Sequence, residues 1–186
     1  MTRWIVLAGL CFALLMVNLN IVSKETLLTE GKPVFLRLAP VDPRSLLQGD
    51  YMRLDYALSR DIYAARQTLI SDDSASYSER ERQIGSEGFV VLKPDERNVG
   101  QFVRLDDGTP IKQDEIKLAY KVHKNRMRIA VDSFFFQEGH AKAYETARYA
   151  EYRVSEQGDW LLASLFDEQL NEIDPVELMK QSVINN

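Results

Sequence analysis

Ser45 is the residue whose type best suits nucleophilic chemistry, and it lies four positions before a Gly-Asp pair at Gly49 and Asp50. A serine hydroxyl attacks a carbonyl group only when a neighbouring base takes its proton. The later chain supplies four candidate bases, Lys93, Lys112, Lys117 and Lys121. No spacing ties any of them to Ser45, and lysines are common surface residues. We therefore interpret Ser45 as a turn serine after Pro43 and Arg44, with a serine hydrolase that uses Ser45 as the alternative.

The two histidines, His123 and His140, are the residues that could begin a metal site. Glu138 lies two positions before His140 and Glu145 five positions after it, but this is no zinc-type spacing. We interpret Glu138 and Gly139 as a corner between a strand and a helix, with an acidic residue near the helix N-terminus. The chain has no glycine-rich phosphate loop either. We expect no metal and no cofactor.

Residues 41–56 read VDPRSLLQGDYMRLDY and combine a proline turn, a Gly-Asp corner and an alternating strand. Asp42 and Pro43 are typical of a turn start, and Gly49 allows a backbone angle or a close approach that a Cβ would forbid. Asp50 can accept hydrogen bonds from the turn amides. These residues favour a mainly structural role for the stretch.

The strand that follows the corner has a clear parity. If it runs regularly from Tyr51 to Leu58, Leu54 and Tyr56 share a face and enter the core, while Tyr51 stands on the opposite face. A small-ligand pocket lined by Tyr51, Tyr56 and residues 134–136 is a further possibility. The candidate binding residues of these regions are Asp42, Arg44, Gly49, Asp50, Tyr51, Leu54, Tyr56, Glu138 and His140.

Strand patterns dominate the chain after residue 30. Alternating or short apolar runs predict strands at residues 34–38, 51–58, 88–92, 102–105, 116–123, 127–131, 152–154 and 160–165. Asp106-Asp107-Gly108 and residues 156–159 are typical of hairpin turns. Helical patterns occupy residues 62–70 and 139–149, and Asp174 caps a third helix. The sequence thus predicts a mainly β fold: a single antiparallel β domain with short peripheral helices.

A basic face is predicted on the hairpin at residues 116–131. Its outward positions carry Lys117, Lys121, His123, Arg126 and Arg128. Such a face could meet anionic headgroups or an acidic partner. It could equally be a solvated strand face paired with Glu115 and Asp132. The sequence leaves both interpretations open.

The N-terminal run from Trp4 to Val22 has no charged residue. Its nineteen residues would make roughly 28 Å of helix, close to the hydrocarbon thickness of a bilayer. Arg3 precedes the run, so the positive-inside rule places the N-terminus in the cytoplasm and the rest of the chain outside the inner membrane, in the periplasm. The exit at residues 17–23 lacks the small-x-small site of a removable signal peptide. We expect an uncleaved anchor at residues 1–23 and an exported domain at residues 24–186.

Charge and cysteine content restrict the classes of function. The chain carries 23 basic and 28 acidic residues, a formal net charge of −5, which argues against nucleic-acid binding. Its single cysteine, Cys11, lies inside the apolar run, so no disulfide framework is expected.

The spacing Gly49-Asp50-Tyr51, Leu54 and Tyr56 resembles that of the bacterial GDYxxLxY family. The lead-in at residues 40–47 and the stretch at residues 134–149 are also similar to that family. The resemblance implies a membrane-anchored protein without an established activity, often found near or fused to multi-pass membrane proteins. It supplies no catalytic residue. We expect a non-enzymatic, membrane-tethered interaction or accessory module with a multi-pass membrane partner; the alternative is the membrane-tethered serine hydrolase.

Overall fold

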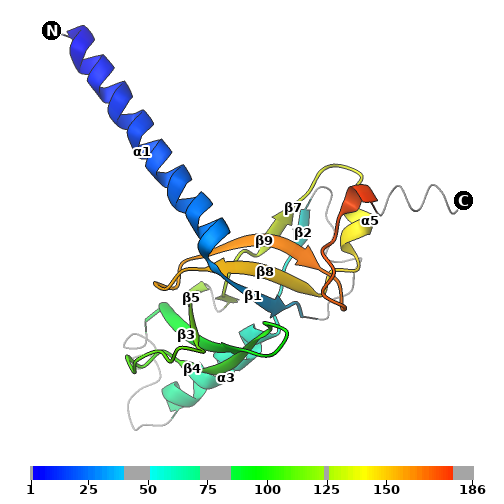
Figure 1. The fold of residues 1–186 in the computed structure, drawn as a ribbon. Helices are drawn as coiled ribbons and strands as arrows, with labels where there is room; N and C mark the ends of the chain where they lie inside the picture. The colour runs from blue at the N-terminus through cyan, green and yellow to red at the C-terminus, as the bar shows by residue number, and fades with distance from the viewer. Residues whose placement is uncertain (1, 40–50, 72–84, 124–125, 178–186) are drawn as a thin grey trace, which may run out of the picture.

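The N-terminal helix α1 (Thr2–Glu30) is the longest element of the computed structural model, which describes residues 2–39, 51–71, 85–123 and 126–177. It projects away from the β-rich body (Figure 1). Val6–Glu30 has a mean hydropathy of 2.2 and exposes its apolar side chains, so this helix is long and apolar enough to cross a membrane. The expected span ended at Val22, but the helix continues to Glu30.

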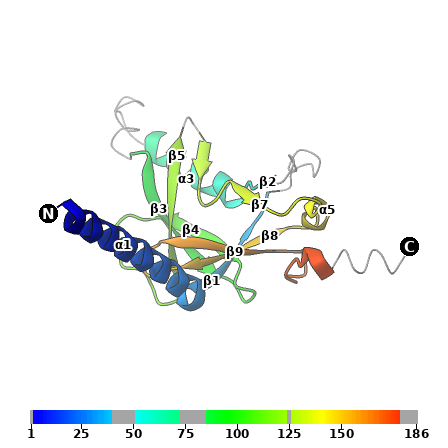
Figure 2. The ribbon, with the colours of Figure 1, turned by 90° about the horizontal axis from the view of Figure 1, so that it is seen from above.

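A three-stranded antiparallel sheet follows α1 and has the order β1-β8-β9. Its strands are β1 (Lys32–Arg37), β8 (Tyr149–Val154) and β9 (Trp160–Phe166). Figure 2 shows α1 leaving the domain beside β8 and β9. The predicted hairpin between β8 and β9 is confirmed, and Gly158 takes a φ of +90° in its turn.

A second antiparallel sheet has the order β4-β3-β5-β6. Its strands are β3 (Glu87–Pro94), β4 (Gly100–Leu105), β5 (Ile116–His123) and β6 (Arg126–Arg128). The predicted hairpin turn at residues 106–108 is wrong. Gly108 does adopt a positive φ, but β4 and β5 pair with opposite edges of β3. A short turn at residues 95–98 joins β3 to β4, so β4 occupies one edge of β3. The ten residues 106–115 then connect β4 to β5, which pairs with the opposite edge of β3.

The strand of the GDYxxLxY motif (residues 49–56) is shorter than predicted. β2 (Tyr51–Arg53) pairs with β7 (Ser133–Phe135) in a two-stranded ribbon, and Tyr56 then makes a single bridge to Leu38. The chain leaves the extended conformation there because α3 (Leu58–Ser71) begins. The predicted parity is confirmed: Leu54 and Tyr56 are buried, and Tyr51 is only half-buried.

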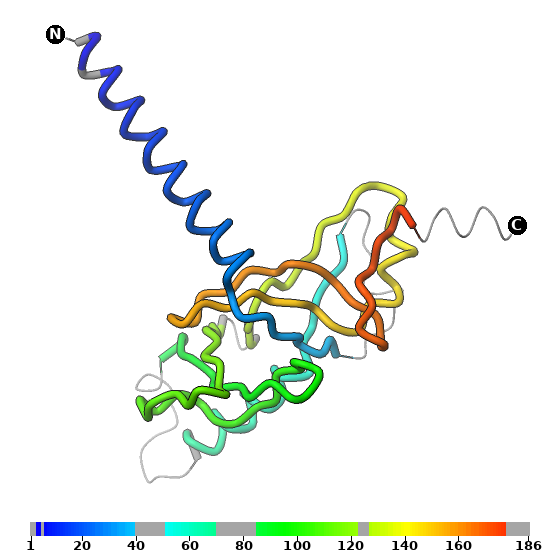
Figure 3. Tube along the Cα trace, viewed as in Figure 1, coloured from blue at the N-terminus to red at the C-terminus, as the bar shows by residue number. Residues whose placement is uncertain are grey.

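The peripheral helices agree only in part with the sequence pattern. α3 contains the predicted helix at residues 62–70. The predicted helix at 139–149 is wrong in length, because α5 (Ala141–Tyr144) is a single turn and Tyr149 already belongs to β8. The side chain of Asp174 accepts bonds from the Val176 and Glu177 amides, as expected for an N-cap. Figure 3 shows this last segment running back from the end of β9 towards α5.

One hydrophobic core lies between the two sheets, the motif and α3. Its largest fully buried side chains include Leu36, Met52, Ile62, Leu92, Leu118, Tyr152 and Leu165. β1 contributes alternate residues to the core, as the pleat requires, whereas β3 and β8 are buried at consecutive positions. The fold is thus mainly β, with antiparallel sheets, short helices and one apolar N-terminal helix.

Candidate functional site

The last tyrosine of the motif is a core residue. The Tyr56 hydroxyl donates to the Val131 carbonyl at 2.7 Å and lies 2.5 Å from the Tyr152 hydroxyl of β8. Burial raises the pKa of Tyr56 well above its ordinary value, and proximity to Tyr152 raises it further. Burial also raises the pKa of Tyr152. Both phenols therefore stay neutral and join the motif to the central strand of the first sheet.

Tyr51 lies on the other face, in the two-stranded ribbon. Its ring is 5.7 Å from that of Phe135, its register partner on β7, and the Phe135 side chain is 74% exposed. The predicted pocket of Tyr51, Tyr56 and residues 134–136 is wrong, because the pleat sends the two tyrosines to different sides. Phe134 and Phe136 instead pack on Tyr144.

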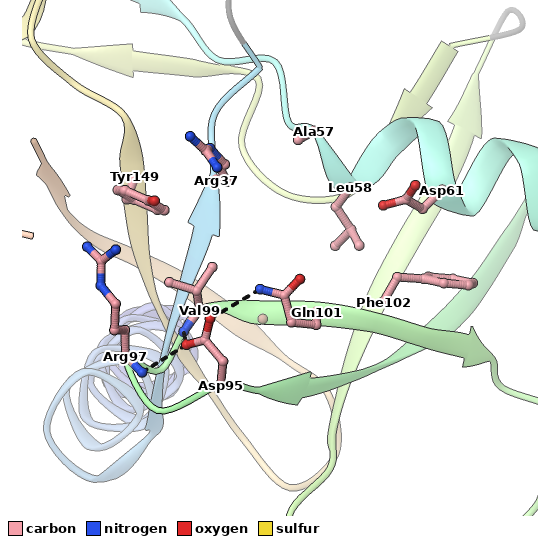
Figure 4. Close-up of a pocket in the computed structure, with 11 residues that line it drawn as sticks. Arg37, Ala57, Leu58, Asp61, Asp95, Arg97, Val99, Gln101, Phe102 and Tyr149 are labelled. Atoms are coloured by element: carbon pink, nitrogen blue, oxygen red, sulfur yellow. Dashed lines mark hydrogen bonds between the residues drawn. The ribbon is translucent and has the colours of Figure 1, made fainter. Parts of the chain in front are cut away.

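A cavity of about 270 Å³ opens directly after the motif. Figure 4 shows Arg37, Arg97 and Tyr149 at one end and Asp61 and Phe102 at the other. Its full lining is Arg37, Ala57, Leu58, Asp61, Asp95, Arg97, Val99, Gly100, Gln101, Phe102 and Tyr149. Residues from β1, the start of α3, the β3–β4 hairpin and β8 thus meet in one place.

Backbone hydrogen bonds hold these elements around the cavity. The Ala57 amide donates to the Arg37 carbonyl at 3.1 Å, which fixes the start of α3 against β1. The Phe35 amide donates to the Asn98 carbonyl at 2.9 Å, which fixes the β3–β4 hairpin against β1 as well. A Cβ at Gly100 would lie 3.0 Å from a Val34 methyl, so glycine allows β4 to approach β1 closely. The cavity walls are therefore rigid backbone elements.

The cationic end of the cavity consists of two arginines over one aromatic ring. The guanidinium carbons of Arg37 and Arg97 each lie 5.8 Å from the centre of the Tyr149 ring, within cation–π range. Arg37 Nη2 lies 3.3 Å from Glu168 Oε1, and Arg97 Nη2 donates to the Glu168 carbonyl at 3.1 Å. Tyr149 and Glu168 together orient both guanidinium groups.

The two acidic residues of the lining differ in their bonding. Asp95 Oδ1 accepts from the amides of Arg97 and Val99, at 2.8 and 2.9 Å, and Gln101 donates to its other oxygen. The Val99 amide bond is the main cause that holds the pKa of Asp95 below its ordinary value. Asp61 is exposed in the first turn of α3, and within the described ranges its carboxylate has no hydrogen-bond or ion-pair partner. Asp95 shapes the hairpin, while Asp61 faces the cavity with no partner among the described residues (Figure 4).

Several predicted site residues lie elsewhere. Asp42, Arg44, Ser45, Gly49 and Asp50 fall outside the described residues. Glu138 and His140 flank Gly139, whose φ of +86° makes the expected corner between β7 and α5, and the His140 side chain makes no cap bond. The ranges that the structure describes contain no group of three or more His, Cys, Asp or Glu that could hold a metal ion.

The predicted basic face carries neutralising partners. Lys117 contacts Asp106, Lys121 lies 2.8 Å from its register partner Glu87, and Arg128 lies 2.9 Å from Asp132. The expected pairing with Asp132 is confirmed, whereas Glu115 instead lies near Arg104 and Lys112. The side chains of His123 and Arg126 are not among those that the structure describes. This geometry favours the solvated, paired strand face over a binding surface.

The lysines considered as bases for Ser45 are also close to carboxylates. Lys93 Nζ lies 2.7 Å from Asp114 Oδ2, and this hydrogen bond raises the pKa of Lys93. Lys112, Lys117 and Lys121 each have an acidic neighbour as well. A lysine whose ammonium group is close to a carboxylate is a poor candidate for the general base of Ser45.

The comparisons with known proteins agree with the motif. No significant match is found among curated proteins or among solved structures. The sequence model of the GDYXXLXY protein family matches residues 13–165, which covers part of α1 and every strand of the domain. This chain therefore belongs to the GDYXXLXY protein family.

Proposed function

We propose that this protein is a membrane-anchored, extracytoplasmic interaction or accessory module that acts with a multi-pass membrane protein. The observation that carries the proposal is the junction between α1 and β1. Only Gly31 separates the end of the apolar helix at Glu30 from the start of the sheet at Lys32. An anchor that merely retains a domain needs no such fixed connection, whereas a module that docks on a membrane neighbour gains from a fixed orientation.

The junction is packed as well as short. The Gly31 amide donates to the Leu27 carbonyl at 3.0 Å, and a Cβ at Gly31 would lie 2.4 Å from that carbonyl and 3.0 Å from the Arg153 Cβ. Beside it, Met16, Ile21, Leu28 and Leu161 line an open apolar groove between α1 and β9. This groove supports the proposal because it continues from the apolar helix, where a transmembrane segment of the partner can cover it.

The orientation that we propose follows from charge. Arg3 precedes the apolar run, so the N-terminus stays in the cytoplasm and the β domain lies on the periplasmic side. The domain's acidic balance and its paired cations give no support for a nucleic-acid partner.

The test uses the full chain in its own membrane. A photo-crosslinking residue at Leu161, beside α1, should capture one multi-pass protein, and the same residue at Glu145 should not. A flexible eight-residue Gly-Ser linker inserted after Gly31 should abolish the Leu161 crosslink without unfolding the domain. The same linker inserted after Gly108, an exposed turn, is the matched control. An unchanged crosslink after the Gly31 insertion would contradict an oriented module.

The serine hydrolase alternative has a separate test. If the protein is an interaction module, Ser45→Ala leaves the Leu161 crosslink and the cellular phenotype unchanged. Labelling of wild-type Ser45 by a serine-directed probe, lost in Ser45→Ala, would establish the hydrolase instead.

A further inference from the structure

We propose that the cavity after the motif binds a small zwitterion of amino-acid to dipeptide size. The ligand carboxylate would lie at Arg37 and Arg97, and its ammonium group at Asp61. This inference concerns a small ligand and does not rest on the proposed membrane partner.

The size of the cavity limits the ligand. Its volume of about 270 Å³ equals roughly nine water molecules in the liquid. This is just below the range of about 300–1,000 Å³ that holds drug-sized ligands. One or two amino-acid residues fit in this volume.

The charges of the lining favour a ligand without net charge. Arg37 and Arg97 contribute two positive charges, and Asp61 and Asp95 contribute two negative ones, so the formal sum is 2 − 2 = 0. Both arginines lie at the Tyr149 end with Asp95, whose oxygens are already bonded within the hairpin, and Asp61 lies at the far end (Figure 4). A ligand with a carboxylate at one end and an ammonium group at the other matches this distribution.

The arginine end has hydrogen-bond donors to spare. Each guanidinium group has five N–H donors. The bonds that Arg37 and Arg97 make through these donors within the described residues go to Glu168 alone, one through each Nη2. Their planes are already oriented by Tyr149, so a carboxylate can accept two or more charge-assisted bonds at little further ordering cost.

The other end and the floor complete the site. Asp61 has no cationic partner in the described part of the chain, and α3 fixes its backbone. Asp95 cannot take its place, because the hairpin amides and Gln101 occupy its oxygens. Leu58 and Val99 lie between the two ends, and together with Phe102 at the Asp61 end they offer apolar contact to a short aliphatic side chain.

The experiment is a calorimetric titration of the full chain in nonionic detergent with alanyl-alanine. Binding is expected below about 10 mM. N-acetyl-alanyl-alanine, which lacks the ammonium group, and alanyl-alanine amide, which lacks the carboxylate, should each bind about tenfold more weakly. These capped ligands test the idea on the unaltered protein, so no variant needs to fold.

Two variants assign each end of the ligand. Asp61→Asn should weaken the binding of alanyl-alanine about tenfold but leave the affinity for the N-acetyl analogue unchanged. Arg97→Gln should likewise weaken the binding of alanyl-alanine about tenfold but leave the affinity for the amide unchanged. Glu145→Gln and Arg128→Gln, on exposed residues outside the lining, are the matched controls. Absence of binding at about 10 mM would overturn the inference. So would equal affinity for the capped and free dipeptides, which would mean that the cavity does not read both charges.

Discussion

Tyr56 shows how a recognisable motif residue can serve the fold without serving chemistry. Its hydroxyl joins the Val131 carbonyl and the Tyr152 hydroxyl inside the core. An ionised phenol would need water or a cation beside it, and burial keeps water away from Tyr56. A proton-transfer role for this tyrosine is therefore disfavoured, and its value lies in satisfying buried polar groups.

The buried tyrosine pair predicts a loss of stability at alkaline pH. Below pH 10 both the folded and the unfolded chain keep these protons, so the pair's contribution is complete. Above pH 10 only the unfolded chain releases them, so each tyrosine should cost about 1.4 kcal/mol of unfolding free energy per pH unit. Denaturant unfolding at pH 8 and pH 11 measures this cost, and tyrosinate absorbance should show two of the eight tyrosines ionising only on unfolding.

Tyr56→Phe supplies the control for that experiment. It removes one of the two late ionisations, so the alkaline slope should fall by about half. At pH 8 it should cost about 1–3 kcal/mol, because the hydrogen bonds to the Val131 carbonyl and to the Tyr152 hydroxyl are both lost. An unchanged slope would show that the pair ionises in the folded state.

Leu54 and Tyr51 test the two faces of the motif strand. Leu54→Ala should lower the unfolding free energy by about 2–5 kcal/mol, because Leu54 is 2% exposed within the core cluster. Tyr51→Ala should lower the unfolding free energy far less, because Tyr51 is only half-buried and its ring packs on the exposed Phe135. Thermal melts of both variants decide the question, and equal losses would contradict the assigned faces. If Tyr51 also contacts the proposed membrane partner, Tyr51→Ala should reduce the Leu161 crosslink with little change in melting temperature.

Residue parity could be predicted from the sequence, but the cavity could not. Alternation fixes which side chains enter a core, because successive residues of a strand face opposite ways. Arg37 and Tyr149 are 112 positions apart and become neighbours only because β1 pairs with β8 in that register. Arg97 joins them through a hairpin turn, and no local spacing signals such a meeting. Asp61 likewise looks like an ordinary acidic residue in the first turn of a helix.

At the scale of elements, the sequence predicted types better than partners. The strand at residues 116–123 occurs with the predicted ends, and those at residues 34–38, 88–92 and 160–165 occur with shifted ends. The Asp-Asp-Gly sequence at residues 106–108 gave a wrong hairpin prediction, because a local turn signal does not say which strand edge is free for pairing. β3 became the centre of its sheet through pairings on both sides. The 139–149 helix stopped early because β8 gains more from pairing with β1 and β9 than a helix of that length gains alone.

The junction between α1 and β1 yields a prediction with an internal control. Gly31→Ala places a Cβ 2.4 Å from the Leu27 carbonyl, so the helix end must move and the unfolding free energy should fall by about 1–3 kcal/mol. Limited proteolysis should then cut near residues 24–31 faster than in the wild type. Gly9→Ala is the matched change, because its Cβ meets nothing within 4 Å, and it should leave both measurements unaltered. Equal behaviour of the two variants would contradict a packed junction.

At the scale of the whole molecule, composition already separated an apolar helix from a β-rich domain. Both parts are present, and the family match spans their boundary. The angle between the helix and the domain was beyond sequence reasoning, because it depends on how Gly31 packs against Arg153 on a strand far along the chain.

The intact protein should behave as an integral membrane protein. Alkaline carbonate washing removes proteins held by surface charge, but the helix Val6–Glu30 would remain inserted. The full-length chain is therefore expected in the carbonate-resistant pellet, and protease added outside the inner membrane should digest the domain. A mature form beginning near residue 23 would show that the segment is a removed signal peptide.

The Gly31 junction also couples the orientation of the helix to that of the domain. One residue separates the helix from the sheet, and β8 and β9 contact the helix, so the connection between α1 and the domain is short and packed. A small change in the tilt of α1, imposed by a neighbour or by bilayer thickness, would be passed on undamped and amplified with distance along the domain. In the orientation that we propose, this geometry would turn a movement inside the bilayer into a displacement of the domain outside it.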